Sequence, residues 1–266
     1  MSENSGQDIL EINENNGETL ILKINRPKVY NALTKEAKLE LIALIRKADR
    51  NPEIRTIIIT GEGKAFCTGQ DLNDRSVRAD ETPVDLGTTL ETEWNPLVNA
   101  IRECSKPVLA AVNGVCAGAG VSVALACDLI IAESEAKFVS GFTKLGLIPD
   151  AGSSHKFSKA MGQQKAFEFF VFNRPMMPEQ MEEYGLINGH DERPLRLCLD
   201  WASKLNKMAP LSLSSLKRNL QQAQDLPYNE MLEREIASQR TLGNSNDYRE
   251  GLSAFFEKRE PQFKGQ

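Results

Sequence analysis

Three short glycine-rich turns, each following an apolar segment, limit the possible folds of this chain more than any other feature. The turn GKAFCTGQDL (63–72) follows the apolar segment RTIIIT, and NGVCAGAGVS (113–122) follows KPVLAAV. A third turn, LGLIPDAGSS (145–154), comes after the segments DLIIAES and AKFV. Short continuous apolar runs are typical of strands that are buried on both faces of a parallel sheet. The pattern therefore predicts parallel strands whose ends carry glycine turns.

The remaining N-terminal sequence alternates strand and helix patterns. Residues 8–13 and 18–25 alternate apolar and polar side chains, which predicts a hairpin of two strands. An amphipathic pattern predicts a helix over 34–49, and a run of small residues predicts another over 119–127. Helices that alternate with short apolar strands indicate an α/β fold with a parallel sheet.

The C-terminal third has a different character. We expect residues 1–200 to form the core that carries the site, and residues 201–266 to form a helical region that packs as a separate layer. Residues 73–92 are charged and lack periodicity, which predicts a long loop near a site or a surface insertion. The helices expected after the core strands cover 163–172, 178–185, 195–209, 211–224 and 228–242.

Composition and charge argue against several partners. The formal net charge of -5 disfavours nucleic acid, whose phosphates require a basic face. No apolar run reaches the roughly 18 residues that cross a membrane, and the polar, acidic start MSENSGQDILEINENN is unlike a secretion signal. The 5 cysteines form no CxxC pair and the chain has 2 histidines, so we expect reduced thiols, no metal site and a cytoplasmic location.

The glycine turns are either plain connections or ligand-binding loops. Gly114, Gly118 and Gly120 do not form the GxGxxG nucleotide motif, and the chain contains neither GxxxxGK[ST] nor GxSxG. A turn that opens a helix points unpaired N–H groups outward, and two neighbouring turns can aim two of them at one oxygen. Asp150 follows Pro149 in the third turn, where it can be an ordinary turn residue or a catalytic base.

Four segments and the C-terminal tail form a specific combination. They are NRPKVYNAL (25–33), GKAFCTGQDL (63–72), KPVLAAVNGVCAGAGVSVALACDLIIA (106–132), AKFVSGFTKLGLIPDAGSS (136–154) and DYREGLSAFFEKREPQF (247–263). This combination resembles the crotonase, or enoyl-CoA hydratase/isomerase, superfamily over nearly the whole chain. The resemblance implies a spiral of ββα units with a C-terminal helical layer used in trimerisation, and a trimer or a dimer of trimers. It also implies an acyl-CoA thioester substrate, with CoA as part of the substrate and no separate cofactor.

The same resemblance implies positions for the site. The N–H groups of Gln70 and Ala119 would form an oxyanion hole for the thioester oxygen, in agreement with two glycine turns that converge. Phe142, Leu145 and Leu147 would line an apolar acyl pocket, in which desolvation would raise the pKa of an aspartate and strengthen it as a base. The remaining substrate and CoA contacts implied by motif position are Lys28, Ala32, Ala65, Gly69, Asp71, Leu72 and Gly118.

Departures from the family pattern indicate the reaction. Aligned on CDLIIA, the two glutamates of the hydratase branch fall at Ser122 and Phe142, neither of which is acidic. The isomerase branches place a single acid where this chain has Asp150, so the resemblance favours Asp150 as the catalytic base.

The expected function is therefore isomerisation of an acyl-CoA. The branch that this chain resembles most implies conversion of ring-1,2-epoxyphenylacetyl-CoA to its oxepin isomer. The alternative of the same class is a Δ3,Δ2-enoyl-CoA isomerase of fatty-acid oxidation. The alternative of another class is a non-catalytic module that binds acyl-CoA, which would be indicated by a lost base or a broken oxyanion turn.

Overall fold

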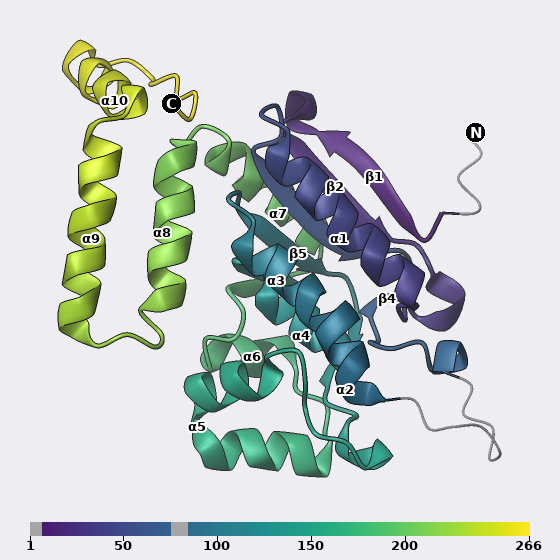
Figure 1. Ribbon diagram of the computed structural model, residues 1–266. Coiled ribbons are helices and arrows are strands. Elements are labelled where there is room, and N and C mark those ends of the chain that lie inside the picture. Colours follow the sequence, from purple (N-terminus) through teal and green to yellow (C-terminus); the bar gives the residue numbers. More distant parts are fainter. Residues whose placement is uncertain (1–6, 76–84) are drawn as a thin grey trace.

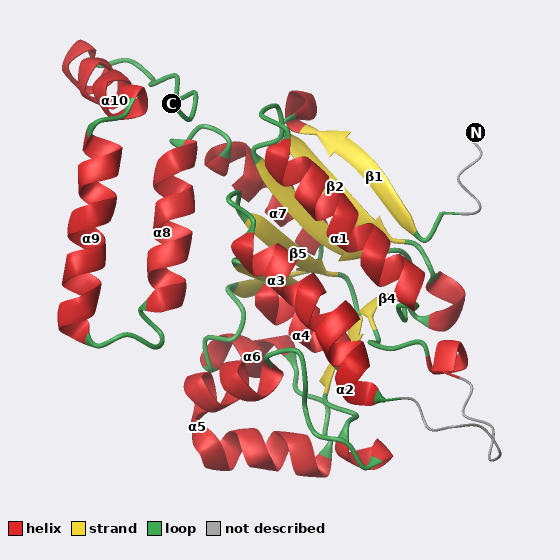
Figure 2. Ribbon diagram, in the orientation of Figure 1, coloured by secondary structure: helices red, strands yellow, loops and turns green. Residues whose placement is uncertain are grey.

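The computed structural model describes residues 7–75 and 85–266 and builds them around two sheets (Figures 1 and 2). Within the described residues, every strand pair is parallel except the N-terminal hairpin. The larger sheet contains, in spatial order, β1 (Ile9–Glu14), β2 (Thr19–Ile24), β3 (Thr56–Gly61), β5 (Val108–Val112), β7 (Leu129–Glu133) and β9 (Gly189–Asp191). The smaller sheet contains β4 (Ala65–Cys67), β6 (Val115–Ala117) and β8 (Phe138–Val139).

The chain winds repeatedly from the larger sheet to the smaller sheet and then into a helix. β3 and β4 lead to α2 (Leu86–Thr89) and α3 (Asn95–Glu103). β5 and β6 lead to α4 (Ala119–Ala126), and β7 and β8 lead to α5 (Ser153–Phe172). The predicted α/β spiral of ββα units is thereby confirmed, and each turn of the spiral contributes one strand end to the edge of the smaller sheet.

The larger sheet is covered on both faces, as its continuous apolar strands predict. Ile57 and Ile59 of β3 face the main core, which includes buried side chains of α1 (Lys35–Arg50), whereas Ile58 faces α7 (Pro194–Leu205) on the other side. All three isoleucines are fully buried, because successive side chains of a strand point to opposite faces and both faces are packed. Among the helices of the described residues, none is both long and apolar enough to cross a membrane.

Most of the predicted elements are confirmed, with different bounds. The hairpin, the helix over 34–49 and the small-residue helix are present. The helix predicted over 163–172 is only the second part of α5, because Gly162 interrupts the helical backbone (φ 77°, ψ 162°) and a further helical segment precedes it. The sequence pattern does not predict β4, β6 and β9 as strands, because three residues are too few for a periodicity signal. The helix predicted over 178–185 is present as the shorter α6 (Pro178–Glu183).

The loop predicted over 73–92 is wrong in part. Residues 86–94 are helical, and the Asp85 carboxylate caps this segment by accepting hydrogen bonds from the N–H groups of Gly87 (2.9 Å) and Thr88 (3.3 Å). A capping aspartate satisfies first-turn amides that have no partner within the helix. Residues 76–84 of the predicted loop, and residues 1–6 of the polar start, lie outside the described part of the chain.

The helices that stand apart from the sheets begin at α8. The division predicted at residue 200 falls inside α7, whose Cys198 and Ala202 both pack against the larger sheet. In Figure 1 the last three helices lie to one side of the sheets. The division into two domains therefore stays a prediction, and the separate helices are α8 (Pro210–Gln222), α9 (Tyr228–Gly243) and α10 (Asn246–Glu257).

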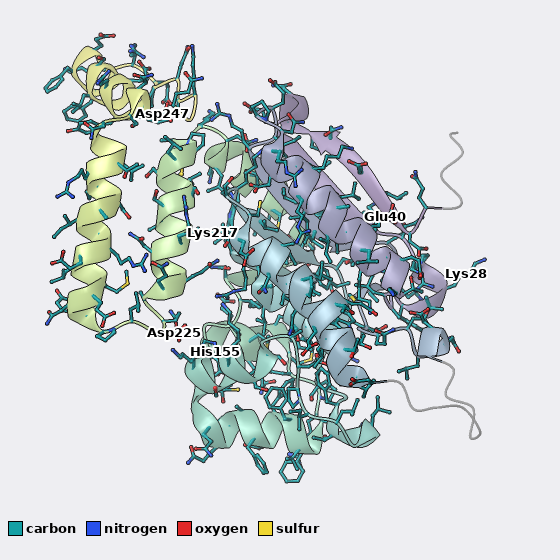
Figure 3. The ribbon with its side chains drawn as sticks, in the orientation of Figure 1. Lys28, Glu40, His155, Lys217, Asp225 and Asp247 are labelled. Atoms are coloured by element: carbon teal, nitrogen blue, oxygen red, sulfur yellow. The ribbon has the colours of Figure 1, made fainter. Side chains whose placement is uncertain are left out.

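Lys217, on α8 (Figure 3), ties this helical arm to the core. Its ammonium group lies 2.8 Å from the Asp128 carboxylate and donates hydrogen bonds to the main-chain oxygens of Ile101 (3.0 Å) and Lys106 (3.2 Å). The Lys217 residue is 9% exposed, so these groups meet largely away from water. Burial raises the pKa of Asp128, and the nearby Lys217 charge opposes that rise.

The Lys217→Met substitution is expected to lower the free energy of unfolding by about 3 kcal/mol, because it leaves the Asp128 carboxylate without its cation in a poorly solvated place. Denaturant unfolding followed by circular dichroism measures this change. The Lys217→Met/Asp128→Asn double variant should recover part of the loss, since no unpaired charge remains. A single variant as stable as the unaltered protein would show that this contact does not hold α8 to the core.

Candidate active site

The smaller sheet brings three loops to one edge. Its strands are parallel in the order β4-β6-β8, and parallel strands end at the same edge of their sheet. The loops that follow these strands begin at residues 68, 118 and 140. These loops belong to, or lead into, the three glycine-rich segments of the sequence, and the first two segments also contain β4 and β6 themselves. Loops that are far apart in the chain therefore meet at one place.

The first turn presents the main-chain N–H of Gln70. Leu33 N–H donates to the Gly69 oxygen (2.7 Å), and Asp71 N–H donates to the Leu33 oxygen (3.0 Å). Because this bridge uses groups of residues 69 and 71, the N–H of Gln70 points away from Leu33. A side-chain carbon at Gly69 would lie 3.0 Å from the Ala119 nitrogen, so the first turn lies directly against the start of α4.

The second turn presents the N–H of Ala119. Gly118 N–H donates to the Val139 oxygen (2.9 Å), and α4 then starts at Ala119. The first amides of a helix have no acceptor within the helix, so they are available to a ligand. A side-chain carbon at Gly120 would lie 2.1 Å from the Cys67 oxygen, so glycine is needed there for α4 to approach β4. Neither Gln70 N–H nor Ala119 N–H has a hydrogen-bond acceptor among residues 7–75 and 85–266.

Asp150 lies in the third turn and is held against the same helix. Its main-chain oxygen accepts hydrogen bonds from the hydroxyls of Ser122 (2.9 Å) and Ser153 (2.9 Å), and from Ser153 N–H (3.0 Å). Ser122 lies three residues after Ala119, or about 4.5 Å along an α-helix. The Asp150 Oδ1 atom is buried. The structure thus brings together the three residues that were predicted to be catalytic: Gln70, Ala119 and Asp150.

The three residues predicted to line the acyl pocket differ in their exposure. Phe142 is buried, at 8% exposure, but Leu145 and Leu147 are 60% and 37% exposed. The backbone turns back at this point, because the N–H groups of both leucines donate to the Phe142 oxygen (2.9 Å and 3.0 Å). This compact turn directs residues 144–148 toward solvent in the single chain, so Leu145 and Leu147 do not enclose a pocket there.

Five of the seven residues predicted to contact CoA divide into two groups. Lys28 and Leu72 are exposed, and the Lys28 side chain extends away from the body of the molecule (Figure 3). Ala32, Ala65 and Asp71 are buried in the single chain. Ala32 directly precedes Leu33, which bridges to the first turn. The CoA contacts of these residues stay a prediction.

The Asp71 carboxylate is already engaged within the protein. It lies 3.0 Å from the Arg26 guanidinium and accepts a hydrogen bond from Asn73 N–H (3.0 Å). Burial tends to raise the pKa of Asp71, but the hydrogen bond from Asn73 and the Arg26 charge outweigh it and hold the pKa below its ordinary value. Arg26 also donates to the Ala32 oxygen, so this ion pair joins the NRPKVYNAL segment to the first turn.

The cysteines do not offer a nucleophile to this site. All five are free and buried, and burial raises the pKa of Cys67, the cysteine beside the first turn, to about 12. A thiol with such a pKa stays protonated near neutral pH and is a poor nucleophile. Within the residues that the structure describes, no group of three or more His, Cys, Asp or Glu side chains lies close enough to hold a metal ion.

Two cavities flank the site without containing the two amides. One, of about 290 Å³, is lined by Ser122, Ala151 and Gly152 and lies directly beside the Asp150 turn. The other, of about 690 Å³, lies where residues of α4 and α5 face Lys217 and Leu220 of α8. The chemistry of the amides and the carboxylate, rather than cavity size, makes this region the candidate site.

Sequence reasoning missed the side chains that hold the first two turns. Lys38 and Trp94 both donate hydrogen bonds to the Gln70 side chain, and their separations from Gln70, 32 and 24 residues, leave no local signal. Asn31 donates to the Ala65 oxygen (2.6 Å) and accepts from Arg26 N–H (2.9 Å). The only local signal for Asn31 is its place in the NRPKVYNAL segment.

Comparison with known proteins gives consistent results. A family model for enoyl-CoA hydratase/isomerase matches residues 14–266. The chain is 38% identical over 248 residues to the 1,2-epoxyphenylacetyl-CoA isomerase of Escherichia coli (strain K12), covering 92% of this chain and 95% of that protein. It is 32% identical over 248 residues to the 2,3-dehydroadipyl-CoA hydratase of the same strain, with 92% and 95% covered.

A solved structure also matches over nearly the whole chain. The crystal structure of an enoyl-CoA hydratase from Polaromonas sp. JS666 superposes with a TM-score of 0.90 at 34% sequence identity, covering 96% of this chain and 99% of that chain. The family match over nearly the whole length, the ββα spiral and the two converging amides agree with one another. The chain belongs to the enoyl-CoA hydratase/isomerase family, within the crotonase superfamily.

Proposed function

We propose that this family member is an acyl-CoA isomerase that uses Asp150 as its base and the N–H groups of Gln70 and Ala119 as its oxyanion hole. The observation that carries the proposal is the Ser122–Asp150 hydrogen bond of 2.9 Å. It fixes the Asp150 turn to α4, within about one helical turn of the Ala119 amide. A base is thereby held near the place where a thioester oxygen would bind.

The proposed reaction is a proton shift within one acyl chain. Asp150 removes a proton from a carbon next to the reacting double bond of a thioester, and the negative charge that develops on the carbonyl oxygen is stabilised by the two amides. The protonated carboxyl group then returns the proton elsewhere on the chain. For a 3-enoyl-CoA the proton leaves C2 and returns at C4, and the product is the conjugated 2-enoyl-CoA with no change in formula.

The residues at the two glutamate positions of the hydratase branch support isomerisation. Ser122 is 2% exposed, and its hydroxyl donates a hydrogen bond to the main-chain oxygen of Asp150. The side chain at this position therefore holds the turn that carries the proposed base, where a hydratase glutamate would hold a water molecule. Phe142 is apolar and buried. Some relatives are named as hydratases, and hydration is therefore the second candidate function that the experiment must separate.

We propose ring-1,2-epoxyphenylacetyl-CoA as the substrate, with a 3-enoyl-CoA as the alternative. In the epoxide the bond shared by the two rings opens to give a seven-membered oxepin ring, and a proton moves from the carbon α to the thioester onto the new ring. The same base and oxyanion hole serve this step. The name of the Escherichia coli relative, 38% identical to this chain, supports the choice.

A non-catalytic acyl-CoA-binding module is the third candidate, and the presence of Asp150 and both amide turns weighs against it.

Self-association into a trimer or a dimer of trimers remains part of the proposal. It is supported by the apolar side chains on the outer helices, where Phe255 and Phe256 are each 77% exposed.

Parallel assays with three substrates test the proposed function. Purified protein should convert the ring epoxide to oxepin-CoA, or 3-hexenoyl-CoA to 2-hexenoyl-CoA, as followed by ultraviolet absorbance and mass spectrometry. With 2-hexenoyl-CoA it should form no 3-hydroxyacyl product. Hydration at a rate comparable to isomerisation would replace the proposal with a hydratase. Binding of all three thioesters without turnover would favour the binding module.

A further inference from the structure

The Gln70 side chain ends in a buried polar cluster, although only the main-chain N–H of Gln70 belongs to the oxyanion hole. Its Oε1 atom accepts hydrogen bonds from Lys38 Nζ (2.7 Å) and from Trp94 Nε1 (3.2 Å). Its Nε2 group donates to the Asp71 oxygen (3.1 Å). Lys38 also forms an ion pair with Glu93. We call Lys38, Glu93 and Trp94 the Gln70 clamp.

The Gln70 clamp is almost completely removed from solvent. Lys38 is 0% exposed, Trp94 is 1% exposed, and the Glu93 side chain is 12% exposed. Removing a lysine and a glutamate from water is costly, and a buried ion pair is often no more stabilising than apolar side chains of the same volume. Stability alone is therefore a weak reason for this pair, and a role in fixing the geometry of its neighbours accounts better for it.

The Gln70 clamp joins two separate elements to the first turn. Lys38 comes from α1, and Glu93 and Trp94 come from the π-helical turn Leu90–Trp94 that precedes α3. The Lys38 ammonium also lies 4.6 Å from the centre of the Trp94 ring, a distance at which a cation and an aromatic face attract each other. Single π-helical turns are rare and frequently occur at functional sites.

We propose that Lys38, Glu93 and Trp94 are positioning residues that set the direction of the Gln70 N–H in the oxyanion hole. This inference rests on the proposed function. The side chain and the N–H of Gln70 share one α-carbon, so fixing the side chain by three hydrogen bonds at its two terminal atoms restricts rotation of the adjoining peptide. Donors in an oxyanion hole act by being oriented in advance, and a displacement of about 1 Å at a reacting centre can cost about 10²-fold in rate.

The Gln70→Met substitution tests this inference. Methionine has nearly the shape of glutamine, keeps the main-chain N–H and leaves Lys38 paired with Glu93, but it cannot accept the two hydrogen bonds. We expect kcat to fall about 10- to 100-fold with KM within about twofold, because the donor is misdirected and not removed. A rise in KM with unchanged kcat would overturn the inference.

Infrared difference spectroscopy gives a readout that a purely structural role would not change. The probe is hexanoyl-CoA with a ¹³C-labelled carbonyl group, which has no double bond to isomerise. Bound to the unaltered protein, its C=O stretch should shift to lower frequency because two N–H donors polarise it. In Gln70→Met this shift should become smaller. If the shift stays the same, the clamp does not position the donor.

A matched pair of double variants separates positioning from stability. Lys38→Met/Glu93→Gln removes the ion pair of the clamp without leaving a buried charge unpaired, and it should reproduce the kcat loss and the smaller carbonyl shift. Lys217→Met/Asp128→Asn removes another buried lysine pair, away from the first turn, and should change neither. Equal kcat losses in both would overturn the inference.

The outcomes also separate this inference from the proposed function. If the unaltered protein produced no carbonyl shift with bound hexanoyl-CoA, the proposed oxyanion hole itself would be wrong. If the unaltered protein shifted the carbonyl and Gln70→Met shifted it equally, the oxyanion hole would stand and the positioning role of the clamp would be lost.

Discussion

Replacing Asp150 with asparagine is expected to lower isomerase turnover by about 10²- to 10⁴-fold, the range over which a positioned general base contributes to a rate. Asparagine has the same shape as aspartate but cannot take up a proton near neutral pH. The three hydrogen bonds that define the turn reach the main-chain oxygen of residue 150, so they do not depend on the carboxylate. We therefore expect thioester affinity within a few-fold of the original value. Initial rates with both isomerase substrates, together with calorimetric titration of hexanoyl-CoA, measure the two quantities.

The control for this variant is Asp200→Asn, which makes the same chemical change on the exposed side of α7. Asp200 pairs at 3.3 Å with Arg196, and its side chain is 51% exposed. Surface pairs of this kind contribute about 0–1 kcal/mol, so full activity and a nearly unchanged melting temperature are expected. An Asp150→Asn variant that isomerises at the original rate would remove Asp150 from the mechanism, and one that is unfolded would show that the residue is structural.

The fold was largely predictable because its signals are local. Continuous apolar strands and the period of α1 are properties of short segments, and a glycine follows each of β4, β6 and β8 within two residues. The misses also have physical causes. β4 and β6 each have three residues, too few to show a period, and the capped helical segment after Asp85 lies within a stretch of charged side chains.

The candidate site was predictable only as a list of positions. The resemblance to the family implies Gln70, Ala119 and Asp150 as positions, but the alignment of the two amides results from the parallel order β4-β6-β8, which no single segment encodes. The exposure of Leu145 depends in the same way on a turn of the folded backbone. Lys38 reads in the sequence as one more polar position on an amphipathic helix, and its burial at 0% exposure follows from contacts with residues that are distant in the chain.

Replacing Gly69 with alanine is expected to lower kcat/KM by about 10²- to 10³-fold, the loss that follows removal of one oxyanion donor. The new methyl carbon would lie 3.0 Å from the Ala119 nitrogen and 3.3 Å from the Ala117 oxygen. At that distance it would block the Ala119 N–H or push the first turn away from α4. Gly69 also has φ +86°, where alanine is strained by about 1–3 kcal/mol, so the melting temperature should fall as well.

Gly185→Ala separates the strain from the obstruction. Gly185 has a similar left-handed backbone, with φ +68°, but an added carbon would meet nothing within 4 Å, and it lies between α6 and β9, away from the amides. This control should lose stability comparably and keep kcat, because its active site stays open. If Gly69→Ala retained its kcat/KM while losing the same stability as the control, the close approach of the first turn to α4 would not form the oxyanion hole. A rate loss confined to Gly69→Ala would locate the thioester oxygen between these two turns.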